Sequence, residues 1–205
     1  MTIIPSNKKL RKRSKADYYP TPPEYVRAVL ERIQQTFWFT ADLHILDPGA
    51  GEGVWGIEAR KLFPEAFIAG TEIRNLPKPA AYDEWYITPF KHFPEVCPVT
   101  FDLIIGNPPF SKVYEFIDPA LALLNPQGGV LSYLLRLAFL ESKKRFDKYY
   151  SRTDSLKPSH VWVSTRRLSF TGNKKSDDTA YAQYTWNIPR SHNTLLDWLD
   201  WNYDD

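Results

Sequence analysis

A short apolar run that leads into a glycine-rich loop is the feature that most limits how this chain can fold. Residues 43–46 (LHIL) are apolar enough for a strand, and residues 47–53 (DPGAGEG) follow them directly. A helix is predicted after the loop, to about residue 63. A strand that passes through a glycine loop into a helix is the repeating unit of parallel α/β sheets.

The other apolar runs continue this order of strands and helices. They do not alternate in polarity, which is typical of strands buried on both faces. Strands are predicted at residues 66–73, 85–88, 101–106 and 129–135, and helices at 22–35, 114–124 and 139–149. Thr21 is expected to cap the first of these helices, ahead of Pro22. The sequence therefore predicts an α/β fold with a mostly parallel sheet and helices on both of its faces.

The C-terminal part of the chain has a different pattern. Residues 161–165 and 181–188 alternate more and flank a polar loop, which predicts a long antiparallel hairpin. Residues 195–201 predict a last helix, with Trp198 and Trp201 packed on the sheet because they are three residues apart. The 205 residues fit one domain, which we place at 17–205, after a flexible basic arm at 1–16.

Composition excludes several classes of protein. Hydrophobic residues make up 43% of the chain, so disorder over its whole length is not expected. Cys97 is the single cysteine and the four histidines lack ligand spacing, so we expect neither a disulfide nor a metal site. The longest apolar run is too short to span a bilayer, and no signal peptide is visible. A cytoplasmic location is the simplest expectation, and a monomer is plausible.

Basic residues are concentrated near the N-terminus. The net charge is only +2, and six basic residues without an acid lie within residues 8–15. Such a segment suits a phosphate backbone, although a solubilising tail or a nuclear address has the same composition. The hairpin carries further candidates. The predicted nucleic-acid-binding residues are Lys8, Lys9, Arg11, Lys12, Arg13, Lys15, Arg166 and Arg167.

The glycine loop and a second acid predict a site for an adenosine-containing ligand. Glu72 ends the strand after the loop, 21 residues beyond Gly51. Adjacent strand ends form one crevice, where an acid can accept both hydroxyls of a ribose. Asp47, just before the loop, would repel a pyrophosphate but suits a ligand with a positive amino group. S-adenosylmethionine has such a group, together with a carboxylate for the loop amides and the helix N-terminus.

A second motif, NPPF at residues 107–110, follows the apolar run FDLIIG. Two prolines stiffen this segment, so that the Asn107 side-chain oxygen and the Pro108 carbonyl form a fixed pair of acceptors. Such a pair suits a planar conjugated amine such as the 6-amino group of adenine, because it stabilises positive charge as the nitrogen is alkylated. Pro109 completes the rigid turn, and the Phe110 ring can stack on the base.

Taken together, these motifs resemble the class I S-adenosylmethionine-dependent methyltransferases, and among them the adenine-specific DNA amino-methyltransferases. The resemblance covers about residues 17–188 and is carried by LDPGAGEG, GTEI and FDLIIGNPPF. It implies the Rossmann-like fold of that family, a seven-stranded sheet that ends in an antiparallel hairpin. It implies a catalytic motif, Asn107, Pro108, Pro109 and Phe110, that holds the target amine. The residues it implies for the cofactor are Tyr19, Thr21, Asp47, Pro48, Gly49, Ala50, Gly51, Glu72, Ile73, Phe90 and Asn107.

The sequence departs from this family in two places. The family usually has an Asp-Phe pair after the third strand, whereas this chain has Pro89-Phe90, so the acid that contacts adenine is missing. No segment is long enough for a separate target-recognition domain, a pattern similar to compact bacteriophage enzymes. DNA is the expected partner. RNA adenine, a protein glutamine and a non-catalytic nucleic-acid-binding relative stay open as alternatives, and NPPF argues against a nicotinamide dehydrogenase.

Overall fold

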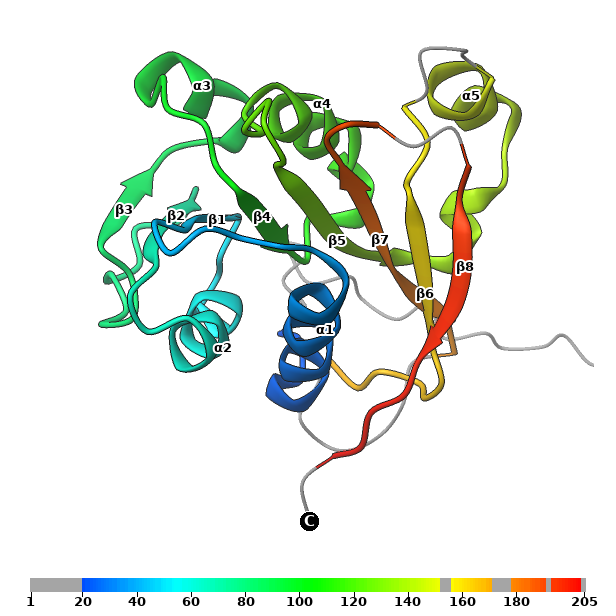
Figure 1. Ribbon diagram of the computed structural model, residues 1–205, viewed down its shortest axis with the longest axis horizontal. Coiled ribbons are helices and arrows are strands. Elements are labelled where there is room, and N and C mark those ends of the chain that lie inside the picture. The colour runs from blue at the N-terminus through cyan, green and yellow to red at the C-terminus, as the bar shows by residue number, and fades with distance from the viewer. Residues whose placement is uncertain (1–19, 152–155, 171–177, 191–192, 204–205) are drawn as a thin grey trace, which may run out of the picture.

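The chain folds around one eight-stranded sheet with the strand order β3-β2-β1-β4-β5-β7-β6-β8 (Figure 1). This computed structural model describes residues 20–151, 156–170, 178–190 and 193–203. The strands are β1 (His44–Pro48), β2 (Phe67–Glu72), β3 (Glu84–Ile87), β4 (Leu103–Gly106), β5 (Val130–Arg136), β6 (His160–Ser164), β7 (Tyr181–Asn187) and β8 (Leu195–Leu199).

The direction of the strands gathers most of their carboxyl ends at one edge. The pairs β3–β2, β2–β1, β1–β4 and β4–β5 are parallel. β7 is antiparallel to both β5 and β6, while β8 is parallel to β6. Of the described strands, β7 is therefore the one that runs against the others. This arrangement confirms the mostly parallel sheet and the antiparallel hairpin.

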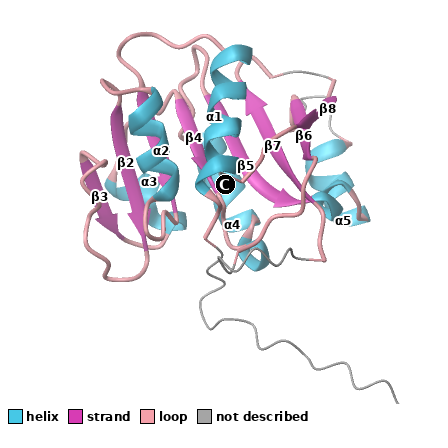
Figure 2. Ribbon diagram, turned by 90° about the horizontal axis from the view of Figure 1, so that it is seen from below, coloured by secondary structure: helices cyan, strands magenta, loops and turns pink. Residues whose placement is uncertain are grey.

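Helices cover both faces of the sheet. The α-helices are α1 (Pro23–Thr36), α2 (Val54–Leu62), α3 (Phe93–Val96), α4 (Tyr114–Ala122) and α5 (Lys143–Arg145). In Figure 1, α1 and α2 lie on one side of the sheet, and α3, α4 and α5 lie on the other. Figure 2, seen from below, places α1 in front of β4 and β5.

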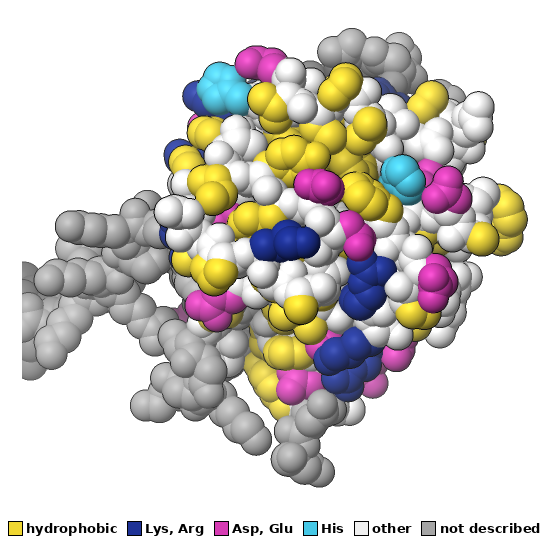
Figure 3. Space-filling model, turned by 90° about the vertical axis from the view of Figure 1, so that its left-hand side faces the viewer, with side chains coloured by type: hydrophobic (Ala, Val, Ile, Leu, Met, Phe, Trp, Pro, Cys, Tyr) yellow, Lys and Arg dark blue, Asp and Glu magenta, His cyan; other side chains and the backbone are white. Residues whose placement is uncertain are grey.

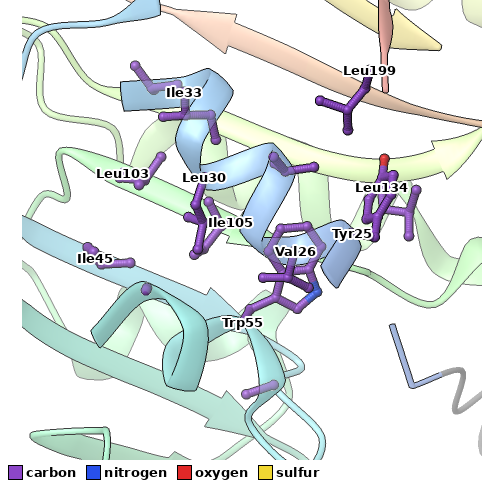
Figure 4. Close-up of a cluster of buried hydrophobic side chains, with 14 of the residues drawn as sticks. Tyr25, Val26, Leu30, Ile33, Ile45, Trp55, Leu103, Ile105, Leu134 and Leu199 are labelled. Carbon is purple, nitrogen blue, oxygen red and sulfur yellow. The ribbon is translucent and has the colours of Figure 1, made fainter. Parts of the chain in front are cut away.

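Each face of the sheet has its own hydrophobic core. On the α1 and α2 side, the apolar stripe of α1 packs against β1, β4 and β5, with Leu199 of β8 at its margin. Figure 4 shows this cluster, in which the labelled residues are Tyr25, Val26, Leu30, Ile33, Ile45, Trp55, Leu103, Ile105, Leu134 and Leu199. On the opposite side, α3 and α4 contribute aromatic residues to the second cluster. Neighbouring strand residues such as Ile45 and Leu46 enter different clusters, which explains the continuous apolar runs.

The prediction of seven strands and a last helix is wrong. Residues Leu195–Leu199 form an eighth strand that pairs with β6. Leu199 and Trp201 are buried, but Trp198 is 61% exposed and does not pack on the sheet. A short apolar run fits a helix and a strand equally well by periodicity, and the open edge of β6 decides for the strand.

Two local predictions also need correction. Residues 139–149 do not form one helix, because Ser142 has a positive φ of 117° and separates a 3-10 turn (Leu137–Leu140) from α5. A π turn (Phe146–Tyr150) follows α5. Thr21 does not cap α1: the cap position is Pro22, without a side-chain hydrogen bond. The Thr21 side chain has another partner, described below.

The edge of the sheet at β3 is partly hydrophobic. Figure 3 looks at this edge and shows hydrophobic side chains gathered in its upper half, on the side of α3, with lysines and arginines lower down. Ile87 of β3 and Val96 of α3 are among the exposed large hydrophobic residues. None of the helices within the described residues is long and apolar enough to cross a membrane.

Candidate active site

A cavity of about 770 Å³ lies where the carboxyl ends of β1, β2 and β4 meet. The loop after β1, the segment after β2, residues 88–91 and the N-terminal half of α4 surround it. Nine predicted site residues line this cavity: Thr21, Gly49, Ala50, Gly51, Glu72, Ile73, Phe90, Asn107 and Pro109. The structure therefore brings the glycine loop, the second acid and the start of NPPF to one place.

The glycine loop is tied to β2 by its own amides. Gly49 N donates to Thr71 Oγ1 (3.3 Å), and Ala50 N donates to the Thr71 carbonyl (2.9 Å). Gly51 N donates to Glu72 Oε2 (2.9 Å). These three amides are used within the protein, and the first turn of α2 adds Val54 and Trp55 to the cavity wall. Pro48 is buried in β1 and does not line the cavity.

The carboxylate of Glu72 is surrounded by donors. Besides Gly51 N, it accepts hydrogen bonds from the backbone N (2.9 Å), Nε (3.0 Å) and Nη2 (3.1 Å) of Arg74. Burial alone would raise the pKa of Glu72, but the Arg74 side chain, the two backbone N–H groups and the Arg74 charge lower it below its usual value. A carboxylate offers about four acceptor positions, and all four are in use here.

Asp47 lies beneath the cavity and does not line it. The residue is 1% exposed, and its Oδ2 accepts a hydrogen bond from the Tyr82 hydroxyl (2.6 Å). Within the described part of the chain, Oδ1 has no hydrogen-bond partner. Burial raises the pKa of Asp47 to about 7. The hydrogen bond from Tyr82 lowers this pKa, but its effect is smaller than that of burial. Asp47 therefore lies one layer deeper than the residues that line the cavity.

Asn107 lies at the end of β4 and lines the cavity, with its amide oriented by Thr21. Asn107 Nδ2 donates a hydrogen bond to Thr21 Oγ1 (3.2 Å), and Thr21 is buried. Because the amide nitrogen is directed to Thr21, the carbonyl oxygen points the other way. The sequence separation of 86 residues between the two explains why this pair was not predicted.

The other two residues of NPPF do not line the cavity. Pro108 is buried, and the Phe110 ring lies beside the cavity, against β5 and β7. The Phe110 ring is 5.5 Å from the Tyr181 ring, and the Arg136 guanidinium lies 5.2 Å from its centroid. Arg136 ends β5 and is paired with Tyr181 of β7, so both flank NPPF at the same edge of the sheet.

The predicted nucleic-acid-binding residues lie partly in the described chain. Arg166 and Arg167 are exposed and follow the carboxyl end of β6, which lies at the same sheet edge as the cavity because β6 runs parallel to β5. The Arg167 guanidinium donates to the Asp178 carbonyl (2.5 Å). Tyr19 and all the predicted residues of the basic arm lie outside the described residues.

The segment that lacks the usual acid forms one wall of the cavity. Thr88, Pro89, Phe90 and Lys91 all line it. The Phe90 ring is buried and lies 5.4 Å from the Phe116 ring, at an angle of 31°. An aromatic wall thus stands where an adenine would pack. In the described part of the chain, no group of three His, Cys, Asp or Glu side chains could hold a metal ion.

Sequence reasoning missed three residues at this site. Arg74 covers Glu72, Tyr82 holds Asp47, and Trp55 lines the cavity with a buried indole N–H that has no hydrogen-bond partner among the described residues. Neither periodicity nor motif spacing indicates these roles. The sequence carries one indirect sign of the role of Tyr82, namely two glycines outside the loop, Gly56 and Gly70. In the structure, a Cβ atom at either position would overlap the Tyr82 ring.

Comparison with known proteins gives a likeness of fold. No family model matches the sequence, and no curated protein matches it. The precorrin-6y C5,15-methyltransferase from Geobacter metallireducens GS-15 is similar in structure, with a TM-score of 0.52 and 21% identity over 82% of this chain and 93% of that chain. The plantazolicin methyltransferase BpumL in complex with SAH gives a TM-score of 0.52 and 16% identity over 78% of this chain and 81% of its own.

A third similar structure, TrmN from Thermus thermophilus, has a TM-score of 0.49 and 18% identity over 78% of this chain. The chain spans about half (51%) of that protein's length. At these identities the likeness concerns the fold alone. Together with the strand order and the antiparallel β7, it shows that this chain has the Rossmann-like methyltransferase fold.

Proposed function

We propose that the chain is an S-adenosylmethionine-dependent methyltransferase that methylates the 6-amino group of adenine in DNA. The observation that carries the proposal is the common cavity of Asn107, the glycine loop and Glu72. This arrangement puts acceptors for an amine next to a site for an adenosine-containing cofactor. The fold is shared with a methyltransferase whose structure contains SAH, the product of such a transfer.

The unpartnered polar atoms at the site fit the amino acid part of this cofactor. That part carries a carboxylate, which needs a donor, and an ammonium group, which needs an acceptor. The Trp55 indole N–H and Asp47 Oδ1 are a buried donor and a buried acceptor without partners in the described chain. The first turn of α2 adds backbone donors and the positive end of the helix dipole beside the carboxylate.

The adenosine part fits the other wall of the cavity. Ile73 and Phe90 provide apolar surface for the adenine ring, and Glu72 provides acceptors for the ribose hydroxyls. Since the Glu72 carboxylate already accepts four hydrogen bonds, ribose binding requires the Arg74 guanidinium to leave it. The backbone hydrogen bonds from Gly51 and Arg74 can stay.

The bound cofactor supplies an electrophilic methyl group on a sulfonium. The Asn107 oxygen accepts one hydrogen of the target amine at the cavity wall. The carbonyl of Pro108, which lies between the lining residues Asn107 and Pro109, accepts the other, and this turns the amine lone pair toward the methyl carbon. As the nitrogen–carbon bond forms and the methyl–sulfur bond breaks, with its electron pair left on the sulfur, the same acceptors stabilise the positive charge that grows on the nitrogen, until one proton is lost to solvent. The Thr21 hydroxyl fixes the Asn107 amide so that this oxygen is preorganised.

A target adenine has to leave the base stack to reach this site, because a stacked amine cannot approach a buried methyl donor. The partly exposed Phe110 ring, supported from behind by the buried Tyr181 ring, lies beside the cavity, where such a base can stack on it. Arg166 and Arg167 lie at the same edge, where cations can contact phosphates.

The test is transfer of a labelled methyl group to DNA by wild-type protein and by Asn107→Ala. Loss of the Asn107 acceptor should lower the transfer rate by about 10²–10³-fold. Asn125→Ala is the matched control, since Asn125 precedes β5 and lies at the opposite edge of the sheet. Equal transfer by wild type and Asn107→Ala would contradict the catalytic role.

Parallel reactions with RNA and with a glutamine-containing peptide decide between the substrates. Labelling of RNA alone or of peptide alone would replace DNA as the substrate, and cofactor binding without any transfer would favour a non-catalytic relative. Long-read mapping of modified bases in DNA from cells that express the protein would then identify the recognition sequence.

A further inference from the structure

Tyr82 is built into the glycine-rich part of the fold more tightly than a surface loop requires. It lies between β2 and β3, yet it is only 2% exposed. A Cβ atom on Gly56 would lie 2.2 Å from its Cζ, and Cβ atoms on Gly53 and Gly70 would each lie 2.8 Å from ring atoms. Three glycines from the loop, α2 and β2 thus leave room for this one ring.

The Tyr82 hydroxyl makes a defined chain of hydrogen bonds. Gly56 N donates to it (3.0 Å), and it donates to Asp47 Oδ2 (2.6 Å). Because the hydroxyl oxygen accepts a hydrogen bond from Gly56 N, its own proton is directed toward Asp47. This chain connects the first turn of α2 with the end of β1, the two elements that the glycine loop joins.

Asp47 lies directly beneath the floor of the cavity. Gly49, Ala50 and Gly51, which follow it, line the cavity, as does Asn107 after β4. A Cβ atom on Gly106 would lie 3.2 Å from Asp47 Oδ1, so this oxygen faces the end of β4. An anion at this depth attracts a cation in the cavity above it, because little water separates the two.

The groups that face Asp47 leave Tyr82 as its one side-chain donor in the described structure. Tyr133 of β5 is near enough for the Asp47 charge to raise its pKa, after the larger effect of burial, but its hydroxyl makes no hydrogen bond among the described residues. Glu72 of β2 is a like charge that raises the pKa of Asp47, a smaller effect than that of burial. Among the groups that affect Asp47, only the Tyr82 hydroxyl and the Gly56 N–H lower its pKa.

We propose that Tyr82 is a positioning residue of the cofactor site, which holds Asp47 as an oriented carboxylate against the positive amino group of the ligand. The inference rests on the proposed function, since it assigns this role within the same site. Tyr82 itself does not line the cavity, so it acts through Asp47 and contacts no reacting atom.

The experiment measures binding of two ligands by calorimetry to wild type and Tyr82→Phe between pH 5.5 and 8.0. Phenylalanine keeps a ring in the space that Gly53, Gly56 and Gly70 leave open, and removes only the hydroxyl. S-adenosylhomocysteine, which carries the amino group, should bind Tyr82→Phe about tenfold more weakly at pH 7. Methylthioadenosine, which lacks the amino acid part, should bind both proteins within about twofold.

The pH profile separates this role from a purely structural one. Binding of S-adenosylhomocysteine to wild type should strengthen as Asp47 loses its proton with rising pH. In Tyr82→Phe the midpoint of this rise should move up by about one pH unit, because the donor that favours the carboxylate is gone. Tyr149→Phe is the control, since it removes the hydroxyl of another buried tyrosine and its partly buried hydrogen bond to Asp118, away from the cavity.

The inference is overturned if Tyr82→Phe binds both ligands with the wild-type affinity and midpoint, or if it weakens both ligands equally at every pH. Failure of the wild type to bind either ligand is a different result, because it overturns the proposed function and the role of Tyr82 with it. A shift for S-adenosylhomocysteine alone supports the assignment.

Discussion

Replacing Gly56 by alanine tests whether the fold depends on the space for Tyr82. Gly56 is the third residue of α2, where alanine would normally stabilise a protein by up to about 1 kcal/mol through helix propensity. Here the new Cβ would lie 2.2 Å from Tyr82 Cζ and 2.5 Å from its hydroxyl oxygen. Helix propensity therefore predicts that Gly56→Ala raises the free energy of unfolding, whereas packing predicts that it lowers it.

The structure indicates that packing dominates. The Tyr82 ring is also enclosed by Gly53 and Gly70 and touches Trp85 edge-on, so it has no free direction in which to move. Overpacking of a core typically costs about 1–3 kcal/mol, and displacement of the hydroxyl from Asp47 adds about 1.5–3 kcal/mol. After subtraction of about 1 kcal/mol for the gain in propensity, a net loss of about 1.5–5 kcal/mol remains. For a chain of this size each kcal/mol lowers Tm by about 2–4 °C.

Thermal unfolding of Gly56→Ala, Tyr82→Leu and the double variant is the assay. Gly56→Ala alone should lower Tm by about 3–20 °C. In the Tyr82→Leu background, which replaces the ring by a smaller side chain, the same change should cost less than about 1 kcal/mol, since the overlapping atoms are absent. A Gly56→Ala protein with an unchanged or raised Tm would refute the packing argument.

Two further predictions concern β8 and the charge of Asp47. Leu199→Ala should lower the free energy of unfolding in urea by about 2–5 kcal/mol, because Leu199 is buried. Leu195→Ala on the same strand should change it by less than about 0.5 kcal/mol, because Leu195 is 61% exposed. Similar losses for the two variants would contradict the orientation of β8. Asp47→Asn should stabilise the ligand-free protein by an amount that grows between pH 4 and 7. The pKa of Asp47 is raised to about 7, so the folded protein holds a proton that the unfolded chain releases over this window, and wild-type stability falls as pH rises. Melting curves of both proteins at pH 4, 6 and 8 check this, and a Tm difference that does not change with pH would contradict it.

The sequence predicted the parallel part of the sheet well because its signals are local. The strands β1, β2, β4 and β5 each contain a mostly apolar run and end in a proline, an acid, a glycine or an arginine. Tyr25, Val29 and Ile33 recur at helical spacing in α1, and all three are buried in the structure. These features depend on a few neighbouring residues and on burial on both sides, which composition reveals directly.

β8 shows where local signals stop being sufficient. The run Leu195–Leu199 has no strong preference between a helix and a strand, and its structure is decided by the free edge of β6, more than 30 residues earlier. The break at Ser142 is similar, since a residue with positive φ interrupts a segment of good helix formers. In both places contacts distant in sequence override the local pattern.

The same distinction separates the two kinds of residue at the candidate site. Gly49, Glu72 and Asn107 could be assigned from sequence because each directly follows or ends a buried strand, and strand ends converge in a parallel sheet. Tyr82 and Arg74 could not be assigned from sequence. Their roles depend on the carboxylate oxygens to which they donate hydrogen bonds, and these contacts follow only from the folded structure. The motif thus specifies where the acids lie, and the residues around them decide how each is used: Arg74 occupies Glu72, whereas one oxygen of Asp47 has no partner within the described residues. Under the proposed function, a ligand with a ribose and an amino group would displace the first contact and complete the second, so its affinity would depend on residues outside the motif.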